Sequence, residues 1–206
     1  MNGAPARIGS DPKEAGMEDP VHERAGQNHG QRPQIDERVS IRIASPEDGE
    51  SLRAMFSRVS SETIYRRFHM PYQEVPERML ALMLGVEEHH DGETLVAIAN
   101  GEIVGHAMYV KLGVSGEAEM AIVVEDRWQS KGVGKLLLRE LAEKARSRGV
   151  ENLVGTVLME NRRMLGLIGA VFSESGRVIT DGAYHFRAPL RTLEPADPAR
   201  ILRRVA

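Results

Sequence analysis

The residues whose types and spacing most clearly suggest chemistry lie between Val123 and Ala142, in the sequence VVEDRWQSKGVGKLLLRELA. An apolar strand is followed by a loop that contains Gln129, Gly132 and Gly134, and the loop leads directly into an amphipathic helix. The N–H groups of such a loop and of the first helical turn point in one direction, and the helix dipole adds about half a positive charge there. Glycine lets a phosphate approach the backbone closely. The segment therefore predicts a site for a phosphate-bearing ligand, and a pyrophosphate fits it best.

The spacing within this loop excludes two common phosphate-binding motifs. A P-loop requires Ser or Thr after its Gly-Lys pair, but Leu136 stands there, and Gln129 occupies the place of the first glycine. A dinucleotide fingerprint requires a third glycine, where this chain has Leu137. The pattern that remains is Gln-x-x-Gly-x-Gly between a strand and a helix. The plainer interpretation is a strand–turn–helix connection whose glycines serve tight packing.

This pattern resembles the acyl-CoA loop of the GNAT acetyltransferase superfamily, which holds the pyrophosphate of coenzyme A. The resemblance implies acetyl-CoA as co-substrate, with Asn161 as a second cofactor contact at the start of a later helix and Met164 packed below it. An N-cap is the plainer role of Asn161, and both roles are compatible. By the same resemblance the pantetheine arm would lie along Ile122, Val123 and Val124, and the pyrophosphate against Gln129, Ser130, Lys131, Gly132, Val133, Gly134 and Lys135.

A carboxylate beside the acyl end of the cofactor is the second chemical requirement. Acetyl transfer to an amine needs a neutral amine, hydrogen-bond donors for the thioester carbonyl and a stabilised thiolate. Glu119 is the predicted general base, since its segment GEAEMA resembles a strand of bacterial Pat-type protein-lysine acetyltransferases whose glutamate has that role. The segment 61–68 resembles a helix of the same subfamily. The alternative is that Glu117 and Glu119 form a solvated acidic face.

The chain also departs from the family pattern. Residues 161–172 are about one residue shorter than in relatives, lack the glycine before Phe172, and contain no tyrosine that could protonate the thiolate. Tyr184 is the only later tyrosine. Three functions therefore stay open: an N-acetyltransferase whose acceptor is a primary amine such as a protein lysine, an acetyltransferase of a small-molecule amine, and a non-catalytic acyl-CoA-binding regulatory module.

The elements that must position these residues follow the order strand, helices, hairpin, strand, helix, strand, helix, hairpin. Apolar alternation and turn signals predict strands at 39–44, 95–99, 103–112, 118–125 and 152–158, and a closing hairpin of 171–175 with 183–188. Helices are expected after Ser45, after Ser60, and at 76–86, 133–148 and 161–168. This order resembles the GNAT fold, an α/β fold with a mixed, mostly antiparallel central sheet flanked by helices.

The bulk composition predicts one domain with extensions. Of the 206 residues, 39–190 would form the GNAT domain, and 191–206 a C-terminal extension. Residues 1–38 are rich in proline, glycine and charge and follow no apolar period, so we expect a disordered N-terminal tail.

Composition also argues against several classes of partner. The net charge of −3 gives no sign of a nucleic-acid partner, and no apolar run is long enough for a membrane span or a signal peptide. A cytoplasmic protein is the resulting expectation, and a homodimer is left open. With no cysteine, the chain cannot form a disulfide or a cysteine-linked acyl intermediate. We expect the His89-His90-Asp91 segment to be a surface loop, and predict no metal site.

Overall fold

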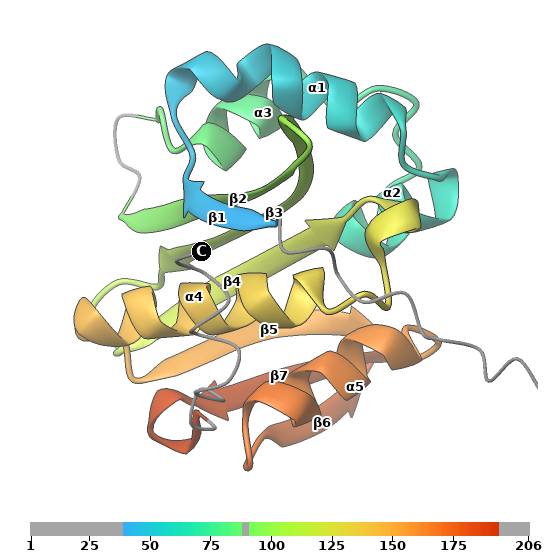
Figure 1. Ribbon diagram of the computed structural model, residues 1–206. Coiled ribbons are helices and arrows are strands. Elements are labelled where there is room, and N and C mark those ends of the chain that lie inside the picture. Colours follow the sequence, from blue (N-terminus) through green and yellow to red (C-terminus); the bar gives the residue numbers. More distant parts are fainter. Residues whose placement is uncertain (1–38, 88–90, 194–206) are drawn as a thin grey trace, which may run out of the picture. The chain divides into compact units, whose positions relative to one another are not determined.

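The computed structural model describes residues 39–87 and 91–193 (Figure 1). The predicted tail 1–38, most of the predicted extension 191–206, and His89 and His90 lie outside these residues. The boundaries drawn at 38 and 190 therefore remain predictions.

The centre of the fold is a seven-stranded sheet in the order β1-β2-β3-β4-β5-β7-β6. Neighbouring strands are antiparallel except β4 and β5, which run parallel. The predicted mixed, mostly antiparallel sheet is thus confirmed. The strands are β1 Ser40–Ile43, β2 Gly92–Ala99, β3 Glu102–Lys111, β4 Glu117–Val124, β5 Asn152–Leu158, β6 Gly176–Thr180 and β7 Ala183–Pro189.

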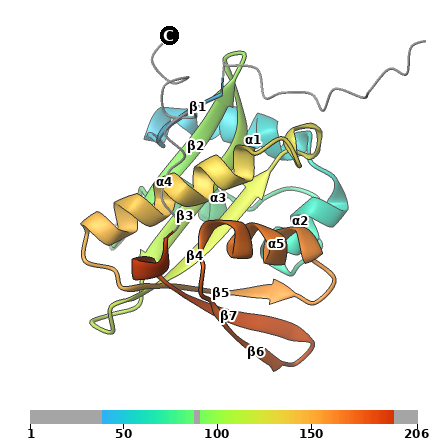
Figure 2. The same cartoon turned by 60° about the horizontal axis from the view of Figure 1, so that its bottom comes forward.

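Helices cover both faces of this sheet. Figure 2 shows α4 and α5 on the near side of the strands, with α1 and α3 behind them. The helices are α1 Gly49–Ser57, α2 Ser61–Phe68, α3 Glu77–Leu84, α4 Val133–Ser147 and α5 Arg162–Val171, with short 3-10 turns at Pro46–Asp48, Asp126–Trp128 and Leu190–Thr192. The predicted helices are all present, and α5 is longer than expected at its C-terminal end.

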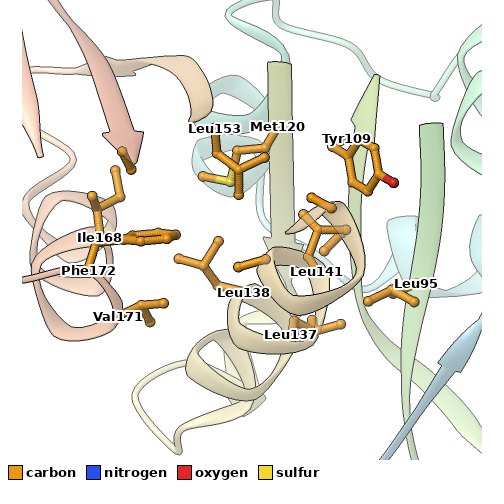
Figure 3. Packing of buried hydrophobic residues seen from close by; sticks show 14 of the residues in the cluster. Leu95, Tyr109, Met120, Leu137, Leu138, Leu141, Leu153, Ile168, Val171 and Phe172 are labelled. Atoms are coloured by element: carbon orange, nitrogen blue, oxygen red, sulfur yellow. The ribbon is translucent and has the colours of Figure 1, made fainter. Parts of the chain in front are cut away.

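Each face of the sheet has its own apolar core. Along β4, Ala118 and Met120 pack with α4 and α5, whereas Val123 packs with α1 and α3. Figure 3 shows the first core, into which α4 directs Leu138 and Leu141 beside Met120. Both leucines are completely buried, so replacing either with alanine should cost about 2–5 kcal/mol. Because α4 is anchored in this core, the loop that precedes it is held in position.

The closing hairpin was predicted correctly in its second strand, β7, and wrongly in its first. Val171 belongs to α5 rather than to a strand, and Phe172 follows it with only 2% of its surface exposed. These apolar residues complete the core-facing side of the helix together with Ile168. The true first strand of the hairpin, β6, is exposed at all five positions, so it carries no buried alternation from which it could be predicted.

The alternating apolar residues at the start of the sheet differ in burial. Val39 and Ile41 pack against the core. Ile43 is 51% exposed, at the end of an edge strand that pairs only with β2.

The feature of the sheet that matters most for function is the separation of β4 from β5. The two strands pair at only three positions, the last of them Glu119 opposite Val154. Beyond this point β4 continues to Val124 and β5 to Leu158 with no pairing between them. The sheet therefore opens at its centre, and the polar backbone groups along the facing edges are left for other partners.

Candidate functional site

A cleft of about 630 Å³ occupies the opening between β4 and β5. Residues of α2, β4, the loop before α4, and α5 line it. It brings together all the predicted site residues except Lys131 and Val133, namely Glu119, Ile122, Val123, Val124, Gln129, Ser130, Gly132, Gly134, Lys135, Asn161 and Met164. Residues chosen from separate motifs thus meet in one place.

The loop before α4 has the backbone form of an anion site. Ser130 and Gly132 both have left-handed backbone angles, with φ of 59° and 90°, and α4 begins at the next residue. Within the described ranges no protein oxygen accepts a hydrogen bond from the N–H groups of residues 130–135. Free N–H groups at the start of a 15-residue helix favour a phosphate.

The side chains of this loop differ in what they contribute. A Cβ on Gly134 would lie 3.3 Å from the Leu167 side chain, so glycine permits the close approach of α5. Val133 is completely buried and can reach a ligand only through its backbone. The Lys131 ammonium lies 5.2 Å from the centre of the Trp128 ring, a cation–π contact on the outside of the loop.

The Gln129 side chain is used by protein partners. Its amide nitrogen donates to the Thr63 hydroxyl at 3.1 Å and to the Val124 carbonyl at 3.0 Å. Its amide oxygen accepts from Arg163 at 2.7 Å. Gln129 therefore joins α2, β4 and α5 around the loop and holds it in position, a role that the motif alone does not show.

Asp126 does not line the cleft but supports it from outside, a role that the sequence did not indicate. Its carboxylate accepts hydrogen bonds from the Ser60 backbone and hydroxyl at 2.8 and 2.9 Å, and from the Thr63 hydroxyl at 2.8 Å. Burial tends to raise the pKa of Asp126, but the hydrogen bonds from Ser60 and Thr63 outweigh it, and the pKa is lowered. The ionised carboxylate ties the start of α2 to the end of β4. The capping signal of Ser60 pointed to a helix start but not to its distant partner.

Glu119 and Glu117 have different surroundings, although they share one strand face. Glu117 forms an ion pair with Arg187 at 2.7 Å and does not line the cleft. Glu119 is exposed, lines the cleft, and is the last residue of β4 to pair with β5. The geometry thus separates the two acids and leaves Glu119 at the rim of the opening.

Asn161 fulfils its expected capping role. Its side-chain oxygen accepts a hydrogen bond from the Met164 backbone at 3.2 Å, which caps α5. Both residues line the cleft, and Met164 also packs against the core. This places the start of α5 opposite the loop.

A second, shallower groove begins at Glu119 and crosses the sheet face formed by β5, β7 and β6. It measures about 490 Å³. The Thr156 hydroxyl lies 3.2 Å from the His185 ring nitrogen on its floor. The polar and charged residues that line it are Glu117, Glu119, Thr156, Arg177, His185 and Arg187. Glu119 therefore borders both the cleft and this groove.

Comparison with known proteins identifies the class. Residues 59–170 match the model of the acetyltransferase (GNAT) family. The chain therefore belongs to this family, as the loop motif and the order of elements predicted, and acetyl-CoA is the co-substrate of the class.

Individual relatives show which members of the family the chain resembles. The chain is 32% identical over 130 residues to acetyltransferase Pat of Mycolicibacterium smegmatis, covering 59% of this chain but only 38% of Pat. It is 28% identical over 137 residues to acetyltransferase PA5475 of Pseudomonas aeruginosa, covering 65% of this chain and 73% of that protein. The solved GNAT domain of S. lividans PAT is 28% identical with a TM-score of 0.67, covering 73% of this chain and 90% of the domain.

Among the residues the structure describes, no three or more His, Cys, Asp or Glu side chains gather to hold a metal ion. No helix in the same residues is long and apolar enough to cross a membrane.

Proposed function

We propose that this protein transfers an acetyl group from acetyl-CoA to a primary amine, that Glu119 is the general base, and that the acceptor is a lysine side chain of a protein. One observation carries the proposal. The opening between β4 and β5 joins a set of unpaired backbone N–H groups at the start of α4 to a carboxylate at the rim of the same cleft.

The cleft fits the parts of coenzyme A. The N–H groups of residues 130–135 and the dipole of α4 suit the pyrophosphate, and the side chain of Lys135 lines the same end. Along Ile122–Val124 the edge of β4 that faces β5 has no strand partner. Its alternating donors and acceptors suit the amides of the pantetheine arm.

Glu119 supports direct transfer. Its carboxylate takes the proton from the acceptor ammonium, directly or through water, and the neutral nitrogen attacks the thioester carbonyl. The new C–N bond forms as the C–S bond breaks, and the electron pair leaves with the sulfur as a thiolate. The second proton of the attacking nitrogen passes to this thiolate or to water, which leaves a neutral amide and coenzyme A. Within the described residues no tyrosine lines the cleft. In the proposed mechanism the thiolate therefore does not receive its proton from a tyrosine.

The open groove beside Glu119 favours a protein acceptor. An exposed carboxylate that borders an open sheet face can be reached by a lysine on the surface of another protein. A small amine gains most of its affinity from an enclosed pocket. The similarity to Pat points to the same subfamily, while the small-amine acceptor and the regulatory module remain alternatives that the assay below separates.

The experiment compares Glu119→Gln with the matched variant Glu117→Gln. Loss of the base should lower turnover by about a hundredfold and leave acetyl-CoA affinity nearly unchanged, and the residual rate should rise with pH as neutral amine becomes available. Glu117→Gln should keep most of the turnover because that carboxylate is occupied by Arg187. Steady-state kinetics between about pH 6 and 9.5 test this. Equal turnover by the Glu119→Gln protein at pH 7 would reject the base.

Thiol release against lysine peptides and a small-amine library identifies the acceptor. Turnover with peptides but not with small amines supports the protein acceptor, and the reverse supports the first alternative. Acetyl-CoA binding without thiol release on any amine would indicate the regulatory module.

A further inference from the structure

The guanidinium of Arg67 is the most unusual charged group in the cleft. Arg67 lies on α2 and lines the cleft. Its Nη2 reaches only the Met108 sulfur, at 3.7 Å, and the guanidinium carbon lies 4.7 Å from the centre of the Phe68 ring. Its Nε is buried without a hydrogen-bond partner. In the part of the chain that is described, no oxygen accepts a hydrogen bond from this side chain.

Arg67 is half-buried, and an arginine whose Nε is shielded from water normally has a carboxylate partner, because desolvating its charge is costly. The preceding residue shows the usual arrangement, since Arg66 pairs with Glu62 one turn away on the same helix. Arg67 keeps its planar set of donors for something else. Burial lowers the pKa of Arg67 to about 10, with the nearby charge of Glu119 opposing that change, so Arg67 is a cation at neutral pH.

The position of Arg67 points to the acceptor side of the cleft. Its contact Met108 pairs across the sheet with Ala121, two residues from Glu119 on the same face of β4. The charged and titratable groups that face Arg67 are His106 of β3, which is buried and neutral, and Glu119 of β4. The cleft thus has an acid for an amine and, beside it, a cation with free donors.

We propose that Arg67 determines acceptor specificity by binding a carboxylate that the acceptor carries next to its reactive amine. This inference rests on the proposed transfer to an amine at Glu119. In a protein the carboxylate would come from an Asp or Glu beside the target lysine, and in a free amino acid it would be the α-carboxylate. The same bidentate hydrogen bonding serves both sources.

The test uses acceptors in pairs that differ only by a carboxylate. Lysine peptides with Glu or Gln beside the lysine form one pair, and free amino acids with their amides form the other. The two members of each pair are compared by their pH-independent kcat/KM. The wild-type protein should prefer the carboxylate member of one pair by about tenfold or more, mainly through KM. The pair that shows the preference identifies the source.

Three variants connect this preference to Arg67. Arg67→Met keeps an unbranched apolar side chain without charge and should bring the ratio close to one, while Arg67→Lys should restore part of it. Arg66→Met is the matched control, because Arg66 lines the same cleft but is already paired with Glu62, and it should keep the preference. An unchanged ratio in Arg67→Met would overturn the inference. An equal fall in kcat/KM for both members of a pair would also overturn the inference. It would mean that Arg67 acts through packing or through a contact with the acyl donor.

A binding measurement makes the test independent of turnover. With coenzyme A present, titration calorimetry compares acetylated peptides and acetylated amino acids with their amide counterparts on the wild-type and Arg67→Met proteins, after melting curves show that both are folded. Carboxylate-selective binding that is lost in the variant supports the inference even if the Glu119→Gln result rejects the proposed base. If the wild-type protein binds the carboxylate and amide members of each pair equally well, the inference is wrong, whatever turnover is measured.

Discussion

His106 should make the stability of this protein depend on pH in a range where carboxylates contribute little. The residue lies on β3 with no exposed surface, and its Nε2 is 2.7 Å from the Met83 carbonyl oxygen. That distance requires a proton on Nε2, so the neutral ring already has its donor in use. Its Nδ1 is buried without a partner. A second proton would lack an acceptor and face the charge of Arg67.

The magnitude follows from the pKa of His106. Burial lowers this pKa from 6.5 to about 3; the Met83 carbonyl opposes the change and Arg67 adds to it. Between these two values the unfolded chain binds one more proton than the native protein, so the stabilisation is complete above pH 6.5 and is lost as the pH falls. Well below pH 6.5 the loss is roughly 1.4 kcal/mol per pH unit, and it sums to about 3 kcal/mol between pH 7.5 and 4.5.

Urea denaturation of the wild-type protein and His106→Gln at several pH values between 7.5 and 4.5 measures this loss. Glutamine keeps an N–H near the position of Nε2 for the Met83 carbonyl but cannot be protonated. Subtracting the two unfolding free energies cancels the contribution of the groups that titrate in both proteins. The difference should move by about 3 kcal/mol in favour of the variant as the pH falls. Parallel curves would refute the reasoning and would mean that a charged His106 finds an acceptor in the native protein.

Three further substitutions test the loop and its support. Gly134→Val should abolish measurable acetyl-CoA binding in calorimetry while circular dichroism shows a folded protein, because the added side chain would crowd Leu167 and Val124, which line the cleft beside the loop; unchanged affinity would contradict the anion site. Gln129→Ala should weaken acetyl-CoA binding by about tenfold through loss of hydrogen bonds that hold the loop, whereas a change in melting temperature alone would make the residue merely structural. Gly155→Ala should lower the unfolding free energy by about 1–3 kcal/mol, since its Cβ would lie 2.8 Å from the Phe186 ring; urea curves that coincide with the wild type would rule out this clash.

Local signals in the sequence predicted the elements well. Asn100 and Gly101 both adopt positive φ, 52° and 80°, and join β2 to β3 as the dipeptide predicts. Ser60 caps α2, and Gly85 ends α3 in the left-handed conformation. These features depend on a few neighbouring residues, so the sequence alone specifies them.

The errors occurred where burial depends on distant partners. β6 is an exposed edge strand, and its sequence shows no apolar alternation, while the apolar residues just before it complete α5. The backbone of the loop before α4 was predictable because glycine and the start of a helix are local features. The bonds of Gln129 to Thr63 and Arg163 were not, because they join segments 66 and 34 residues apart.

The difference between the two glutamates of β4 depends on the same long-range geometry. Glu117 and Glu119 alternate identically along the strand, so no periodicity can distinguish them. Pairing with β5 continues through Glu119 and then stops. Glu117 lies at the start of the paired region, where Arg187 of β7 reaches it across β5, whereas Glu119 lies where the strands separate. The divergence that opens the cleft also leaves one carboxylate at its rim, and this is why the strand separation, rather than the acidic pair itself, supports Glu119 as the proposed base.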